Sequence, residues 1–260
     1  MPVAALLLAA SLLQTPPSVT GTRYKFNIIT DDDSTAGMVR EDGRRARIDF
    51  FRKDASDDYV LVLDGGRRVV SIHPREGEYG MTDDSTFARV AAIGLRAASA
   101  TGVVRFRVRD MHVSSRRLGA GERVAGLPTE RFRMIQEFTV AVSALGLPGE
   151  TMHQVVVTDY WVNRSVGLVP NPIIALVSTI HSILGQTDLE FTERSSAVRQ
   201  DLFSGTPLRI VVTSHTLEEP NKVSTQRIEI TALERDSFDR SLWDIPAGLR
   251  RREGEFSWHF

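Results

Sequence analysis

The sequence predicts an α+β protein in which antiparallel β-structure dominates: a strongly curved sheet, or incomplete barrel, with helices covering its concave face. Three observations lead to this fold class. Most of the chain alternates apolar and polar residues with period two, which is typical of strands that have one buried and one solvated face. Glycine-containing turns separate these segments. Three other segments show the apolar spacing of helices, which makes them the natural cover for the sheet.

The alternating segments predict about nine or ten strands in hairpin-like order. Hairpin turns are expected at Glu41–Gly43 and Asp64–Gly66, and a tight turn at Gly126–Pro128, because glycine adopts positive φ without a Cβ clash. The clearest strands are Tyr24–Ile28, Ala46–Phe50, Tyr59–Leu63, Arg68–Ile72, Val104–Arg109, Arg131–Val140, Met152–Val162, Leu208–Leu217 and Val223–Leu233.

The helical segments are expected at residues 84–100, 172–184 and 187–203. The second begins with Asn171 as N-cap and Pro172 at the first helical position, and it ends before Gly185. Its apolar stripe is wide, which indicates burial on more than one side. Two interpretations remain open for it: a helix that fills the curved sheet as plain core, or a lid over an apolar cavity.

The composition of the chain excludes several classes of function. The chain has 260 residues, of which 42% are hydrophobic and 25% charged, the balance of a globular protein. A formal net charge of −1 gives no attraction to nucleic acid, so we expect no nucleic-acid partner. The absence of cysteine excludes disulfides, thiolate metal sites, a cysteine nucleophile and lipid anchoring through an N-terminal cysteine.

The N-terminus predicts export. Residues from Val3 to Leu13 are apolar except for Ser11, a run too short to span a bilayer but suited to a signal peptide. The alternative is a buried first helix. We therefore divide the chain into a signal peptide and lead-in (1–20), a single curved-sheet domain (21–250) and a C-terminal tail (251–260). We expect a soluble periplasmic or secreted protein that does not span the membrane.

Residues of a catalytic or metal site are not apparent. The six histidines are scattered without the i, i+4 spacing of a zinc helix, and Asp31–Asp33 lack the alternating ligands of a calcium loop. We expect no enzyme activity and no cofactor. Arg105, Arg107 and Arg109 share one strand face, with Arg131 and Arg133 expected beside them. This stripe could bind an anionic partner, but pairing with Glu130, Glu137 and Asp110 is the simpler interpretation.

Three motifs carry a resemblance to a known family. They are Val124–Phe132, a turn that leads into a long strand; Thr158–Val162, a strand that ends in Trp-Val; and Ser241–Leu249, which holds Trp-Asp-Ile-Pro-Ala-Gly-Leu. Taken in order, they resemble the lipoprotein-carrier-like superfamily (LolA/LolB-like) and the related DUF4412-type periplasmic domains. The resemblance implies a curved antiparallel sheet whose open face is covered by helices, and a cavity that holds acyl chains in the carriers.

We therefore expect an exported soluble protein that binds a hydrophobic or acylated ligand, such as a lipid, between sheet and helices. The alternative is a structural or protein-interaction domain of the cell envelope, with a packed core, an envelope protein as partner and no ligand. The candidate cavity residues are apolar residues of two strands and of the second helix: Phe106, Phe132, Met134, Phe138, Ile173, Leu176, Val177, Ile180 and Leu184.

Overall fold

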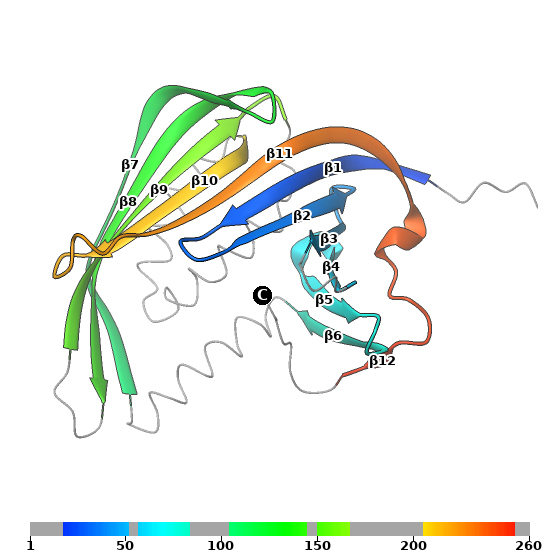
Figure 1. The fold of residues 1–260 in the computed structure, drawn as a ribbon, viewed down its shortest axis with the longest axis horizontal. Helices are drawn as coiled ribbons and strands as arrows, with labels where there is room; N and C mark the ends of the chain where they lie inside the picture. Colours follow the sequence, from blue (N-terminus) through cyan, green and yellow to red (C-terminus); the bar gives the residue numbers. More distant parts are fainter. Residues whose placement is uncertain (1–17, 52–56, 84–103, 145–149, 167–204, 253–260) are drawn as a thin grey trace, which may run out of the picture.

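The computed structural model describes residues 18–51, 57–83, 104–144, 150–166 and 205–252. They form one open sheet of twelve strands (Figure 1). In chain order the strands are β1 (Ser18–Ile29), β2 (Ser34–Glu41), β3 (Ala46–Phe51), β4 (Tyr59–Leu63), β5 (Arg68–His73), β6 (Glu78–Asp83), β7 (Val104–Val124), β8 (Leu127–Ala144), β9 (Glu150–Asn163), β10 (Thr206–Thr216), β11 (Ser224–Asp239) and β12 (Arg250–Arg251).

The topology is a pair of meanders joined through the first strand. The strand order is β12-β6-β5-β4-β3-β2-β1-β11-β10-β9-β8-β7. Every neighbouring pair is antiparallel except β12 and β6. The sheet curves, so that β7–β10 form one wing and β1–β6 the other, with the long β11 bridging them (Figure 1). The prediction of antiparallel sheet is confirmed.

The predicted α+β class with helices over the concave face is wrong for the described residues. They contain no α-helix, only the short 3-10 helices η2 (Asp64–Gly66) and η3 (Arg240–Trp243). The segments 84–100, 172–184 and 187–203, on which the expected helices depended, lie outside the described residues. No described α-helix therefore covers the concave face of the sheet.

Strands are longer than the sequence indicated because bulges interrupt the alternation without ending the strand. The strand expected to end at Arg109 continues as β7 to Val124. Its pairing with β8 shifts register after Arg109, Arg117 and Gly121, and each extra residue reverses which side chains face the core. Residues 18–20 of the expected lead-in likewise belong to β1, where Val19 pairs with Phe238.

The two faces of the sheet differ in chemistry. We call the face that carries Tyr24 and Val39 the inner face and the one that carries Arg40 and Arg47 the outer face. Directly paired residues share a face, so the register identifies two apolar rows on the inner face. One is Phe132–Tyr160–Ile210–Ile228–Ile28, from β8 to β1, and the other is Tyr24–Val39–Ile48–Val60, from β1 to β4. Both rows are buried except for the half-buried Ile28.

Gly37 shows how tightly the inner face is packed. Phe26 and Phe50 meet edge to face over this glycine, with ring centroids 5.9 Å apart. A Cβ at position 37 would lie 2.3 Å from Cζ of Phe26 and 2.6 Å from the carbonyl oxygen of Asp49. Only glycine leaves room for the two rings at this point of the sheet.

The outer face of β4–β6 has its own core. Trp243 of η3 is 2% exposed and packs edge to face against Phe238, and both belong to a cluster with Leu61, Val70 and Ile72. The indole N–H of Trp243 donates to the carbonyl of Arg40, which secures η3 to the sheet. The C-terminal segment therefore covers this part of the outer face. No helix of the described residues is long and apolar enough to cross a membrane.

Candidate functional site

Three of the predicted cavity residues share the inner face of β8. Phe132, Met134 and Phe138 follow at even spacing, and each is at least nine-tenths buried. Phe132 and Met134 form a cluster with Tyr160, Val162 and Ile210. The strand partners therefore place a compact apolar surface on the inner side of β8–β10, as the alternation predicted.

The remaining predicted cavity residues are not brought to this surface by the described structure. Phe106 lies opposite Val142 in the β7–β8 pairing, and its side chain is not among those described. Ile173, Leu176, Val177, Ile180 and Leu184 lie outside the described residues. The described part of the candidate site is therefore made of strands alone.

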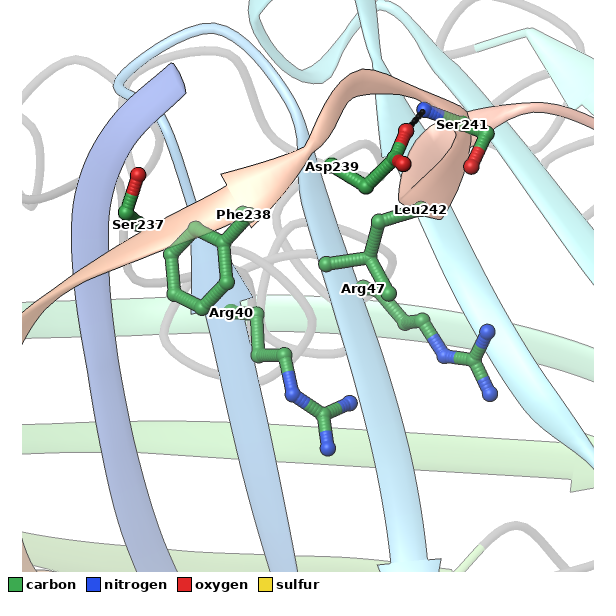
Figure 2. Close-up of a pocket in the computed structure, with 7 residues that line it drawn as sticks. All are labelled: Arg40, Arg47, Ser237, Phe238, Asp239, Ser241 and Leu242. Atoms are coloured by element: carbon green, nitrogen blue, oxygen red, sulfur yellow. Dashed lines mark hydrogen bonds between the residues drawn. The ribbon is translucent and has the colours of Figure 1, made fainter. Parts of the chain in front are cut away.

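The two wings of the curved sheet overlap in the view of Figure 2. Figure 2 views β1–β3 from the outer side, and pale green strands of the other wing pass behind them. The apolar rows of the inner face are buried, apart from the half-buried Ile28. Such a surface can bury acyl or aromatic groups, and it presents almost no charge.

One carboxylate interrupts this inner face. Glu41, at the end of β2, is 4% exposed and lies opposite Thr22 of β1. Burial raises the pKa of this carboxyl group, outweighing the opposing hydrogen bonds from the backbone N–H of Gly43, at 2.6 Å, and from the Thr22 side chain. The sequence placed Glu41 in a turn and did not indicate that it is buried. Its burial depends on the pairing of β2 with β1, which places the Glu41 side chain on the inner face.

The outer face of β8–β9 carries an ionic cluster around Asp159. Its carboxylate accepts hydrogen bonds from Nη2 of Arg131 at 2.6 Å and from Nε and Nη2 of Arg133 at 2.8 and 2.7 Å. Burial by itself would raise the pKa of Asp159, but the hydrogen bonds from Arg133 and Arg131 outweigh it and hold this pKa below its usual value. Asp159 is therefore charged and fully engaged, as expected of a structural group.

Trp161 connects this cluster to the next strands. Its ring lies between two guanidinium groups, with Cζ of Arg131 4.9 Å and Cζ of Arg209 5.2 Å from the ring centroid. Arg209 in turn donates to Glu229 and Glu122 at 2.8 and 2.7 Å. Cation–π contacts of this kind stabilise by about 0.5–2 kcal/mol each. The outer face of β8–β11 therefore carries paired charged side chains around one aromatic ring.

The predicted arginine stripe is not assembled. Arg105, Arg107 and Arg109 lie opposite Ser143, Ala141 and Thr139, whereas Arg133 lies opposite Arg116. The two arginine groups therefore occupy different stretches of the β7–β8 ladder. The expected partners differ as well, since Asp159 of β9 engages Arg131 and Arg133.

Metal ligands do not gather in the described part of the chain, where no three histidine or carboxylate side chains lie close enough to hold an ion. His153 instead pairs with Glu218, whose Oε1 is 2.6 Å from Nδ1. The Asn163–Ser165 sequence, which matches a glycosylation site, forms a closed turn. Asn163 is 2% exposed, donates to the carbonyl of Pro128 and accepts from Ser165 and Val166.

An open recess of about 460 Å³ lies on the outer face near η3 (Figure 2). Arg40 and Arg47 extend into it below Phe238 and Leu242. Both guanidinium groups bind the same carboxylate, that of Asp49, at 2.6 and 2.8 Å. The guanidinium of Arg47 also stacks 3.6 Å from the ring centroid of Tyr59.

Charge in the recess is nearly balanced. Asp49 neutralises one of the two arginines, and Asp239 contributes a second carboxylate at the rim, capped by the backbone N–H of Ser241. An anionic ligand would therefore meet little net attraction. The shared carboxylate of Asp49 joins β2 to β3, which is a structural role.

Comparison with known proteins was made for the whole chain. No protein-family model matches it, and no curated protein matches it either.

Proposed function

We propose that the protein is an exported binding protein, without catalytic activity, that holds an acyl chain or a similar apolar ligand against the inner face of its curved sheet. One observation carries the proposal. Two apolar rows in direct register together cover eight strands of the inner face, one from Phe132 on β8 to Ile28 on β1 and the other from Tyr24 on β1 to Val60 on β4. The apolar N-terminal segment and the resemblance to lipoprotein carriers support it at the level of sequence.

The energetics of such a site are simple. Transfer of each methylene from water to an apolar surface contributes about 0.8 kcal/mol, equivalent to roughly a fourfold gain in affinity. Lengthening a bound acyl chain by two carbons should therefore strengthen binding about fifteenfold until the surface is filled. A polar or charged site would not show this dependence on chain length.

A competition experiment tests this. The full chain is titrated with a fluorescent fatty acid, which is then displaced by saturated fatty acids of ten, twelve and fourteen carbons. We expect the displacement constants to fall steeply with chain length. If no fatty acid displaces the probe, and if native mass spectrometry of the purified protein shows no bound lipid, the proposal is wrong and the structural or protein-interaction alternative stands.

Neighbouring residues of β8 provide a matched pair of variants. Met134 points to the inner face and Ile135 to the outer face, and both are apolar residues of similar size. Met134→Ala should weaken fatty-acid binding about tenfold, because it removes contact surface from the inner face. Ile135→Ala should leave binding unchanged. Equal effects of the two variants would place the ligand elsewhere.

A further inference from the structure

The two edges of the sheet are unequal. At one edge, β6 is only six residues long, and β12 pairs with it at Glu78 and Tyr79. The backbone N–H of Arg252 also donates to the carbonyl of Tyr79 at 2.9 Å. At the other edge, β7 is 21 residues long and, among the described residues, pairs only with β8. Among the described residues, one edge is thus short and covered, and the other is long and has no neighbouring strand beyond β7.

An uninterrupted window lies in the middle of β7. From His112 to Arg117 each residue pairs in simple register with β8, opposite Glu137 to Phe132, without a bulge. In an antiparallel ladder, alternate residues direct both backbone N–H and C=O away from the partner strand. About three of these six residues therefore offer a donor and an acceptor to a further strand.

Solvent reaches this window from both sides. Ser115, Arg116, Arg117 and Leu118 are exposed, although successive side chains of a strand point to opposite faces. Leu118, at 36% exposure, is one of the exposed large apolar residues of the described chain. The residues at the end of the window are consequently accessible above and below the sheet.

Charge selects the kind of strand that fits. Six arginines, but only Asp110 and Glu122 as carboxylates, occur between Val104 and Val124. Arg117 is paired with Glu130, whereas no described residue forms an ion pair with Arg109 or Arg116. A second copy of β7 would bring like charges together, which opposes self-pairing. An acidic strand would gain the opposite interaction.

We propose that β7 is a docking edge that takes an acidic, extended segment of a partner protein as an added strand beside His112–Arg117. The backbone of the partner supplies hydrogen bonds and its carboxylates pair with the arginines, which is the known physics of recognition by strand addition. This surface lies apart from the inner face, so the inference does not rest on the acyl-ligand proposal.

A synthetic peptide serves as the probe: eight residues that alternate glutamate and valine, labelled with fluorescein and followed by fluorescence anisotropy with the full chain. We expect binding that weakens as salt is added. A peptide that alternates lysine and valine is the control and should not bind. If both peptides bind equally well, charge does not select the partner and the proposal is overturned.

Charge reversal at the edge gives the first pair of variants. Arg116→Glu should raise the dissociation constant of the acidic peptide at least tenfold. Arg44→Glu makes the same change at an exposed position in the turn between β2 and β3, in the other wing, and should alter it less than twofold. Equal effects would indicate attraction by overall charge alone and would refute a site at β7.

Proline tests the backbone. Because adjacent residues direct their N–H groups to opposite sides, one of Ser114→Pro and Ser115→Pro removes an outward N–H and leaves the β7–β8 ladder intact. The variant that keeps wild-type stability should lose peptide binding. If it binds normally, the peptide does not add as a strand.

Amide hydrogen exchange locates the partner directly. The acidic peptide should protect amides between His112 and Arg117. Protection that appears without peptide and increases with protein concentration would instead show a second copy at this edge and would overturn the acidic-partner proposal. Displacement of the fluorescent fatty acid should be unaffected by the peptide, so failure of either proposal can be recognised separately.

Discussion

Replacement of Asp159 by asparagine should destabilise the fold more than loss of an exposed carboxylate on the outer face. Asp159 lies at the centre of β8–β9 and is only 7% exposed. Asparagine keeps the size of the side chain but removes its charge and replaces one carboxylate oxygen by an NH2 donor, so the three hydrogen bonds from Arg131 and Arg133 cannot all be kept. Two guanidinium groups then face each other without a shared anion.

The magnitude follows from the geometry. Hydrogen bonds to charged groups contribute about 1.5–3 kcal/mol, and loss of a partner from a buried pair costs about 3–5 kcal/mol. The side chains of Arg131 and Arg133 are 35% and 28% exposed, so water partly replaces the lost acceptor. We expect Asp159→Asn to lower the free energy of unfolding by about 2 kcal/mol.

Urea unfolding at pH 7, followed by tryptophan fluorescence, measures this change. Asp236→Asn is the control, because Asp236 pairs with Arg23 at 3.1 Å between side chains that are about one-third exposed. The control should cost less than about 1 kcal/mol. Equal losses in the two variants would show that burial and multiple hydrogen bonds do not set the strength of the Asp159 cluster.

The pH dependence provides a second check. The folded-state pKa of Asp159 is lowered, so its stabilisation is present above the unfolded-state pKa, about 3.9, and is lost as pH falls through the folded value. The difference between wild type and Asp159→Asn should therefore shrink as the pH falls below about 4. A difference that stays constant down to the acid unfolding transition would contradict an ionic origin.

Three further predictions concern stability, each measured by thermal or urea unfolding. Gly37→Ala should destabilise by about 3 kcal/mol, because its Cβ would meet Phe26; little change would show that the sheet can open at this point. Ala125→Asn should stabilise by about 0.5–1 kcal/mol, since Ala125 has φ 49° beside Gly126 with φ 76°, and Asn-Gly favours this turn; destabilisation would exclude strain at Ala125. Glu41→Gln should be at least as stable as the wild type at pH 7, because burial raises the folded-state pKa of Glu41 and the wild type therefore loses stability as the pH rises. The difference in stability should vanish below about pH 4, and a variant less stable than the wild type at pH 7 would contradict this reasoning.

Period-two alternation was sufficient to predict the central part of most strands, because it records which side chains face the core. It also identified Phe132, Met134 and Phe138 as residues of one face. It did not predict the ends of strands, because a bulge adds one residue and reverses the pattern while the backbone continues to pair. The strand β7 therefore appeared to end at Arg109.

The local sequence pattern could not predict which side chains meet across neighbouring strands. Arg131 and Arg133 were expected beside Arg105–Arg109, but the β7–β8 register places the two groups apart, and Asp159 arrives from β9. Glu41 became a buried carboxyl in the same way, through its position opposite Thr22. A shift of one residue in either ladder would have given different partners, and no neighbouring residue in the chain encodes that choice.

The sequence by itself determined that this protein is built largely from antiparallel strands in which apolar and polar residues alternate, because side-chain chemistry sets the period of burial. Only the tertiary structure decided that the twelve described strands join in one open sheet and that two apolar rows, one from β8 to β1 and one from β1 to β4, lie in register. It also decided that β6 is covered by β12 while β7 presents its edge. These features depend on the hydrogen-bond register between segments that are distant in the sequence. A strand has such a register only once it pairs with its neighbours.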